Sequence, residues 1–117
     1  LDKIVLLGSP SDMSRIMKDY QKILKLNPKF MTTLEAYFKQ KFGYNFEEFS
    51  IAEFSKTIEN KTLIIHDQYD RVAPVEAAHA IHQNLKNSSL KITEGAGHSL
   101  NKEEIRSAIV KFLNTNP

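Results

Sequence analysis

Three short apolar runs restrict the folds that this chain can adopt. They occupy Lys3–Leu7, residues 62–65 and residues 90–92, and the first run is stopped by the glycine, serine and proline at 8–10. A continuous apolar run of this length fits a strand that is buried on both faces, as in a parallel sheet. The second run is also rich in β-branched residues, which favour strands.

Segments with helical periodicity follow the second and third runs. Pro74 opens the first of these helices, and Asn101 and Glu104 have the spacing of a capping box before the second. The alternation of strands and helices indicates parallel strands joined by right-handed crossovers. The predicted fold class is α/β, a parallel sheet of about three strands with flanking helices and a helical insertion. The apolar stripes are Val75, Ala78, Ile81 and Leu85 in the first helix, and Ile105, Ala108, Ile109, Phe112 and Leu113 in the second.

The region between the first two apolar runs is too long for a plain crossover. Apolar residues at helical spacing predict a helix here, with Ser11 or Asp12 as its N-cap. Asn27 followed by Pro28 predicts the start of a second helix, and Gly43 predicts its end.

The chain is therefore expected to have three parts. Residues 1–10 would form a core strand and the floor of a site, residues 11–57 a helical cap or lid, and residues 58–117 the C-terminal core. Aromatic residues between positions 37 and 54 are expected to form the interior of the cap. No internal repeat or low-complexity linker interrupts this order.

The composition is that of an ordinary globular domain. Of 117 residues, 41% are hydrophobic and 26% are charged, which is too apolar for disorder. The net charge of +2 is scattered, so no electrostatic footprint for nucleic acid is present. The absence of cysteine excludes disulfides and thiolate chemistry without fixing the compartment; a cytoplasmic location is expected. No stretch approaches the roughly 20 apolar residues of a membrane span.

Chemically active side chains follow the apolar runs. Asp67 and Asp70 come after the second run, and His98 comes after the third, 28 residues beyond Asp70. In open parallel sheets, ligands bind at the carboxyl ends of the strands, and this spacing brings two adjacent strand ends together. A carboxylate beside an imidazole holds its tautomer and stabilises its protonated form. Asp70 and His98 together would make a general base.

Structural alternatives exist for each of these residues. Asp70 could be a carboxylate that stabilises the N-terminus of the helix after Pro74, and His98 could be a loop histidine bonded to backbone. Their combination at neighbouring strand ends, with glycines beside His98, favours a site. His66 is interpreted as structural, positioning the loop after its strand.

Metal binding is the weaker interpretation of the remaining candidates. His79 and His82 lie three residues apart on a predicted helix, but no third ligand is evident and a surface position is favoured. Asp67 and Asp70 are a minor candidate for a hard cation.

The stretch TLIIHDQYDRVAPVEAAHAI, followed by LKITEGAGHS and an amphipathic last helix, resembles the C-terminal end of an α/β-hydrolase. That family shows an apolar strand, His-Gly-x-x-Asp-x-x-Val-Pro, a helix, a strand and Gly-x-Gly-His. By this resemblance Asp70 falls on the acidic residue of the catalytic triad and His98 on its histidine. KIVLLGSPSD resembles the family's sixth strand, after which a cap is inserted. The resemblance covers most of the chain and is weakest over the helical insertion.

Two residues depart from the family pattern. Asp67 stands where glycine is commoner, and Ala73 replaces valine before Pro74. Neither change removes a catalytic group. Asp67 adds a rival carboxylate, so the assignment to Asp70 rests on the motif.

The resemblance implies a serine hydrolase that cleaves a small ester or related acyl bond through an acyl-enzyme, without a cofactor. The serine would lie in a Gly-x-Ser-x-Gly elbow before the start of this chain, together with the oxyanion-hole amides. Ser9 precedes the cap and is expected to line the floor of the site rather than to attack the substrate. The cap's aromatic residues would line an acyl site. This chain alone is expected to be inactive.

A sheet that begins with Lys3–Leu7 would expose an apolar edge. The expected partners are therefore a missing N-terminal half or a second chain, or a second copy in a homodimer through that edge, besides a small acyl substrate. Nucleic-acid and membrane partners are not expected. The alternative hypothesis is a non-catalytic α/β binding module, or a hydrolase relic, that acts through a partner.

Overall fold

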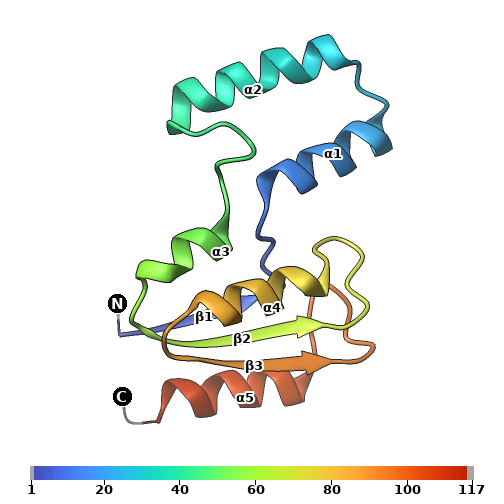
Figure 1. The fold of residues 1–117 in the computed structure, drawn as a ribbon. Coiled ribbons are helices and arrows are strands. Elements are labelled where there is room, and N and C mark those ends of the chain that lie inside the picture. The colour runs from blue at the N-terminus through green and yellow to red at the C-terminus, as the bar shows by residue number, and fades with distance from the viewer. Residues whose placement is uncertain (1, 116–117) are drawn as a thin grey trace. The chain divides into compact units, whose positions relative to one another are not determined.

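A computed structural model of the chain describes residues 2–115 (Figure 1). Three parallel strands form one sheet in the order β1-β2-β3, with helices on both faces of the sheet, which confirms the predicted fold class. The strands are β1 (Lys3–Leu7), β2 (Lys61–Asp67) and β3 (Ser88–Thr93). The helices are α1 (Met13–Leu24), α2 (Pro28–Phe42), α3 (Ile51–Phe54), the 3-10 helix η1 (Ser55–Thr57), α4 (Val75–Asn84) and α5 (Glu103–Leu113).

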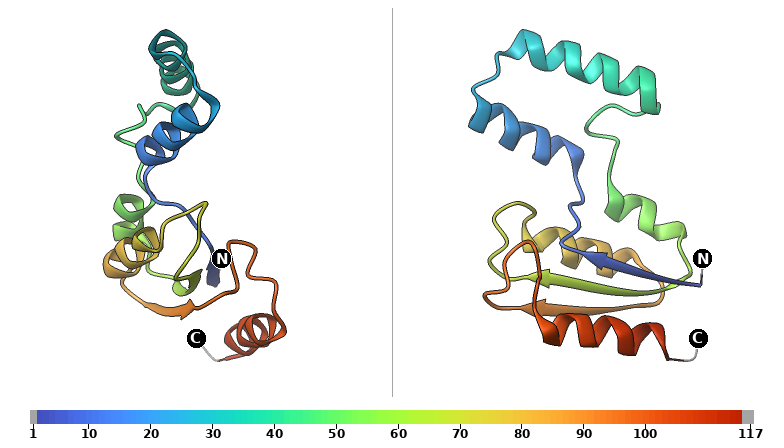
Figure 2. Two further views of the ribbon diagram at one scale, coloured as in Figure 1. Left: turned by 90° about the vertical axis from the view of Figure 1, so that its right-hand side faces the viewer. Right: turned by 180° about the vertical axis from the view of Figure 1, so that it is seen from behind.

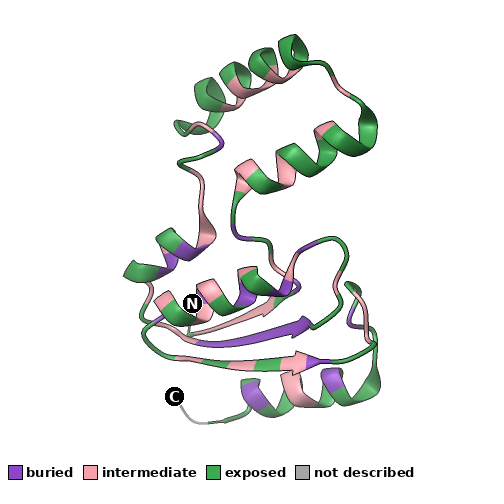
Figure 3. Cartoon of the chain, turned by 45° about the vertical axis from the view of Figure 1, so that its right-hand side comes forward, coloured by how far each residue is buried: buried purple, intermediate pink, exposed green. Residues whose placement is uncertain are grey.

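The central strand β2 is the most buried element of the sheet (Figure 3). Ile64 is 1% exposed and Ile65 is fully buried, because neighbouring strands flank β2 on both sides. Burying a side chain of this size contributes about 1.5–3 kcal/mol. The register pairs Leu7 with Ile65 and Asp67 with Thr93, so the carboxyl ends of the three strands meet at one edge of the sheet.

Helices α4 and α5 cover opposite faces of the sheet (Figure 2). Side chains alternate between the faces along a strand, so neighbouring residues of β2 pack against different helices. On the α5 face, the core consists of Leu63, Ile65, Leu100, Ile105 and Phe112. On the α4 face, Ile64 is buried together with the fully buried Ala78 and Ile81 of α4. The predicted apolar stripes of these two helices thus face the two core layers, except that Leu113 of α5 is exposed.

The chain divides into two compact units. One contains the sheet, with the residues before position 12 and after position 51, and the other comprises residues 12–51. The second unit falls within the predicted cap segment 11–57, and its role as a cap stays a prediction. Within residues 2–115, no helix is long and apolar enough to cross a membrane.

The unit of residues 12–51 is a helical hairpin followed by a loop. As predicted, Asn27 caps α2: its side chain accepts a hydrogen bond from the Phe30 amide at 2.7 Å. Gly43 ends the same helix in the left-handed conformation, as predicted. Phe38 lies at the centre of an aromatic cluster, with ring centroids 4.8 Å from Phe42, 5.1 Å from Phe46 and 5.7 Å from Phe49.

The predicted capping box at the last helix is wrong. Helix α5 begins at Glu103, its N-cap is Lys102, and no side chain caps it. The side chain of Asn101 instead accepts a hydrogen bond from Arg106 Nη1 at 2.6 Å. The guanidinium is a charged donor within reach, and it engages the oxygen that a cap would use.

Candidate active site

Asp70 and His98 lie in direct contact at the carboxyl edge of the sheet. His98 Nδ1 is 2.8 Å from Asp70 Oδ2. The Asp70 side chain is buried, whereas that of His98 is 44% exposed. An ionised carboxylate only accepts hydrogen bonds, so Nδ1 carries the proton and donates. Nε2 is then the ring nitrogen that is free to exchange a proton with a reacting group.

The two oxygens of Asp70 have different partners. Oδ1 accepts hydrogen bonds from the amides of Val72 at 2.8 Å and Ala73 at 2.9 Å, while Oδ2 faces His98. Burial raises the pKa of the Asp70 carboxyl, but the Ala73 amide, the His98 hydrogen bond and charge, and the Val72 amide outweigh it and hold the pKa below its ordinary value. Asp70 therefore stays ionised at neutral pH.

Asp70 does not cap helix α4 through a side-chain hydrogen bond. The N-cap of α4 is Pro74, without a side-chain cap. Asp70 instead orders the loop before the helix through Oδ1. The same carboxylate fixes its own loop with one oxygen and holds the imidazole with the other.

His66 is fully buried and lies next to Asp70. Its Nε2 lies 2.7 Å from the Ala73 carbonyl oxygen and 3.4 Å from Asp70 Oδ2. A carbonyl only accepts, so Nε2 carries the proton. Nδ1 has no hydrogen-bond partner among the described residues, so a second proton there would be a buried donor without an acceptor. Through Nε2 the His66 ring ties the loop of Asp70 to the end of β2.

The rival carboxylate of Asp67 is engaged elsewhere. Its side chain is buried, and Oδ1 accepts hydrogen bonds from the Thr93 hydroxyl at 2.7 Å and the Ala96 amide at 2.8 Å. Oδ2 accepts one from the Tyr69 amide at 3.1 Å. The Thr93 hydroxyl, opposed by burial and helped by the amides of Ala96, Tyr69 and Gly97, holds the pKa of Asp67 below its ordinary value. The carboxylate that contacts His98 is that of Asp70.

The backbone of Gly8 packs closely against the His98 ring. A Cβ atom at position 8 would lie 3.1 Å from Nδ1 and 3.2 Å from Cε1 of His98. The φ of Gly8 is also +61°, a conformation that other residues rarely adopt. The sequence signals this only by a glycine directly after a strand. Ser9 follows, and its hydroxyl donates to the Pro10 carbonyl at 3.0 Å.

The remaining two histidines lie on α4. His82 Nδ1 is 2.6 Å from the Ser88 hydroxyl, and His79 is exposed on α4. Within residues 2–115, no group of three or more histidine, aspartate or glutamate side chains is placed to hold a metal ion.

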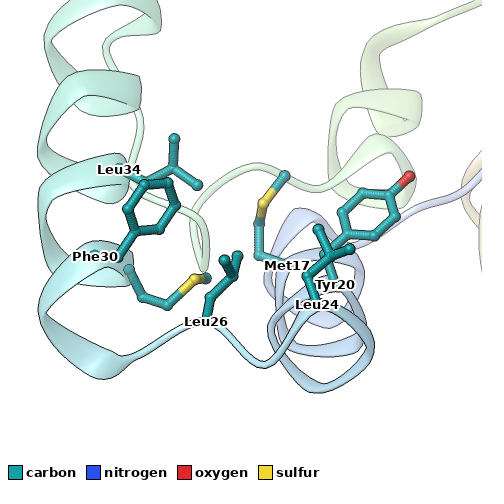
Figure 4. A pocket seen from close by; sticks show the side chains of 7 residues that line it. Met17, Tyr20, Leu24, Leu26, Phe30 and Leu34 are labelled. Carbon is teal, nitrogen blue, oxygen red and sulfur yellow. The ribbon is translucent and has the colours of Figure 1, made fainter.

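The unit of residues 12–51 carries an apolar groove of about 360 Å³ between α1 and α2 (Figure 4). None of the residues that line this groove belongs to the aromatic stretch 37–54, and the role of that stretch in an acyl site stays a prediction. Within the stretch, Phe42, Phe46 and Phe49 pack around Phe38. The groove is lined by Met17, Tyr20, Leu24, Leu26, Phe30, Met31 and Leu34.

A family model described as TAP-like protein, an α/β-hydrolase family, matches residues 47–116. The match covers more than half of the chain, including both Asp70 and His98. This chain belongs to the α/β-hydrolases. The family resemblance inferred from the sequence motifs is therefore confirmed.

Similar proteins include named enzymes of this family. The proline iminopeptidase of Xylella fastidiosa (strain Temecula1 / ATCC 700964) is 42% identical over 48 residues, which are 41% of this chain and 15% of that protein. The same enzyme from strain 9a5c matches equally. The matched segment thus spans only a small part of the relatives' length.

Solved α/β-hydrolase structures share the fold. MGS-M2, an α/β hydrolase enzyme from a Medee basin deep-sea metagenome library, superposes with a TM-score of 0.65 at 14% identity, covering 99% of this chain and 57% of that one. The esterase EaEST of Exiguobacterium antarcticum gives 0.60 at 18% identity, covering 97% of this chain and 57% of that one. The chain spans about half the length of these enzymes.

Proposed function

We propose that this chain supplies the acid and the base of a serine hydrolase that cleaves a small ester or related acyl bond through an acyl-enzyme. The observation that carries the proposal is the 2.8 Å contact between His98 Nδ1 and the buried Asp70 carboxylate. Asp70 precedes His98 in the chain, in agreement with the order of serine, acid and histidine in α/β-hydrolases. The serine would lie outside this chain.

In the first half of the reaction, Nε2 of His98 takes the proton of the serine hydroxyl as the serine oxygen attacks the acyl carbon. The bond to the leaving group then breaks, and the leaving group takes the proton from Nε2. Asp70 keeps Nδ1 protonated and stabilises the imidazolium between these steps. Because the Asp70 side chain is buried, water screens its charge less than it would screen an exposed carboxylate, and the charge favours the protonated ring.

In the second half, Nε2 takes a proton from water, and the resulting hydroxide attacks the acyl-enzyme. The acyl–serine bond breaks, and the proton passes to the serine oxygen. The chain's own contribution is the same in both halves: one imidazole that moves one proton, held by one carboxylate. No cofactor takes part in this scheme.

A second candidate substrate is a peptide with an N-terminal proline. It is favoured by the 42% identity over 48 residues to the proline iminopeptidase of Xylella fastidiosa. The acid and base would act in the same way on an amide, where protonation of the leaving amine is the more demanding step. The choice between ester and amide depends on residues outside the pair.

The alternative from another class is a binding module that keeps the hydrolase fold without catalysis. A fluorophosphonate probe, which phosphonylates activated serines, discriminates the two in the full-length protein. We expect labelling of the native protein, loss of labelling in His98→Ala, and normal labelling in His79→Ala, which removes an exposed histidine of α4. Equal labelling of both variants, or no labelling of the folded native protein, would contradict the proposal.

A further inference from the structure

The carboxylate of Asp67 joins the two segments that carry the Asp70–His98 pair. On one side, Oδ1 accepts hydrogen bonds from the Thr93 hydroxyl at 2.7 Å and the Ala96 amide at 2.8 Å. On the other side, Oδ2 accepts one from the Tyr69 amide at 3.1 Å. A single buried side chain, at the end of the central strand, thus contacts both loops.

This position requires an ionised carboxylate. These three neighbours are donors, as is the Gly97 amide, and an ionised carboxylate is a pure acceptor. Asparagine would turn an amide N–H toward one of these donors, and glycine would leave all three without this acceptor. Asp67 is only 1% exposed, so water is a poor substitute.

The contacts lie next to the pair in the chain. Tyr69 directly precedes Asp70, and Ala96 lies two residues before His98. Loss of the Asp67 contacts would let the two loops shift independently, and a misplacement of about 1 Å costs up to about 100-fold in rate. We propose that Asp67 is a positioning residue that aligns His98 with Asp70. The proposal rests on the function proposed above.

Two threonines of the sheet offer a matched comparison. Thr93→Val removes the hydroxyl that Asp67 accepts from. Thr62→Val removes the hydroxyl of another buried threonine, near the start of β2, which donates to the Asn60 carbonyl at 2.9 Å. Both substitutions keep the shape of the side chain and remove one buried hydrogen bond. Asp67→Asn tests the carboxylate itself.

The first readout is the protonation pattern of the His98 ring, measured by ¹⁵N-histidine NMR on the full-length protein. We expect a ring protonated at Nδ1 in the native protein and in Thr62→Val, and a mixture of tautomers in Thr93→Val and Asp67→Asn. The second readout is the hydrolysis of p-nitrophenyl acetate. We expect kcat to fall about 10-fold in Thr93→Val and about 100-fold in Asp67→Asn, with KM little changed and Thr62→Val near normal.

If Thr93→Val and folded Asp67→Asn both match Thr62→Val in ring NMR and in kcat, the proposal is overturned. If Asp67→Asn fails to fold, Thr93→Val decides alone. Failure of the proposed function is seen separately, as undiminished hydrolysis by His98→Ala. The tautomer measurement does not depend on hydrolysis, so it still tests whether Asp67 positions the ring.

Discussion

At the scale of single residues, the His98 ring is bounded by two close neighbours. Asp70 Oδ2 lies 2.8 Å from Nδ1, and the backbone of Gly8 closes in on the same edge of the ring. The carboxylate sets the tautomer, while the missing Cβ at position 8 leaves room for the ring. Both neighbours are therefore needed for the ring to take this position.

Gly8→Ala is expected to displace the imidazole. The new methyl group would lie 3.1 Å from Nδ1, so the contact with Asp70 lengthens and kcat/KM for ester hydrolysis falls by at least about 10-fold. Gly95→Ala is the matched control: its φ of +89° imposes similar backbone strain, of about 1–2 kcal/mol, but nothing lies within 4 Å of the new Cβ atom. Equal activity in the two variants would contradict this account of Gly8.

The family motif predicts that Asp70, rather than Asp67, lies beside His98, and the two side chains are in contact. Their roles as acid and base stay a prediction. The contact of Gly8 with His98 was not predictable in the same way. It joins loops that are about 90 residues apart in the chain, and it depends on backbone conformation rather than on residue type. The partners of Asp67 were missed for a related reason: Thr93 gives no sign in the sequence that it faces a carboxylate.

At the scale of elements, β2 is buried on both faces and paired on both edges, whereas β1 pairs on one edge only within the part of the chain that the structure describes. Leu7 of β1 is the register partner of Ile65, yet it is 47% exposed. Two apolar residues that lie side by side in the sheet therefore contribute very differently to stability.

Ile65→Ala is expected to lower the free energy of unfolding by about 2–5 kcal/mol, because it leaves a cavity between β2 and α5. Leu7→Ala, at the paired position of the edge strand, should cost less than about 1 kcal/mol. Urea unfolding of the 117-residue chain, followed by circular dichroism at a concentration where the chain is monomeric, measures both. Equal losses would show that β1 is as well covered as β2.

The carboxyl groups of Asp67 and Asp70, at and after the end of β2, make the stability of the fold depend on pH. The pKa values of Asp67 and Asp70 are both below their ordinary value in the folded state. Their contribution to stability is therefore complete above the ordinary carboxyl pKa of about 3.9 and is lost as pH falls through the lower folded values. We expect the melting temperature to fall steeply below about pH 4, and Asp70→Asn to flatten that slope. A slope that is the same in Asp70→Asn would contradict this.

Elements were largely predictable because their signals are local. The three strands and the ends of α2 follow from apolar runs, from Asn27 with Pro28, and from Gly43. The start of α5 was not predictable in this way. Asn101 is a residue type that often caps helices, but its side-chain oxygen accepts a hydrogen bond from Arg106 instead. A side chain five residues away competes for its oxygen, and the capping pattern does not include that competitor.

At the scale of the whole molecule, strand β1 lies at an outer edge of the sheet, where its backbone can pair with another strand. Among residues 2–115, the backbone of β1 pairs with β2 on one side only, and an uncovered edge of a sheet is a template for another strand. We propose that β1 pairs with further hydrolase sequence, with a second chain or with a second copy of this one.

The isolated 117-residue chain is accordingly expected to self-associate, and analytical ultracentrifugation over a range of concentrations measures this. Leu7→Lys, on the edge strand, should shift the chain toward monomer, because lysine on an edge opposes pairing. Leu113→Lys is the control: Leu113 is 50% exposed but lies on α5. A monomeric native chain with high cooperative stability would contradict the expectation.

The most direct test of the central claim is the kcat/KM for a short acyl ester of the full-length protein and of three variants. If Asp70 and His98 are the acid and base, His98→Ala and Asp70→Asn each lower kcat/KM by about 10⁴-fold or more. His98→Ala removes the base that deprotonates the serine, and Asp70→Asn no longer holds the imidazole in the required tautomer. His79→Ala keeps near-native activity. Near-native turnover in His98→Ala and Asp70→Asn would leave their 2.8 Å contact as a structural feature of the loop and would contradict the account.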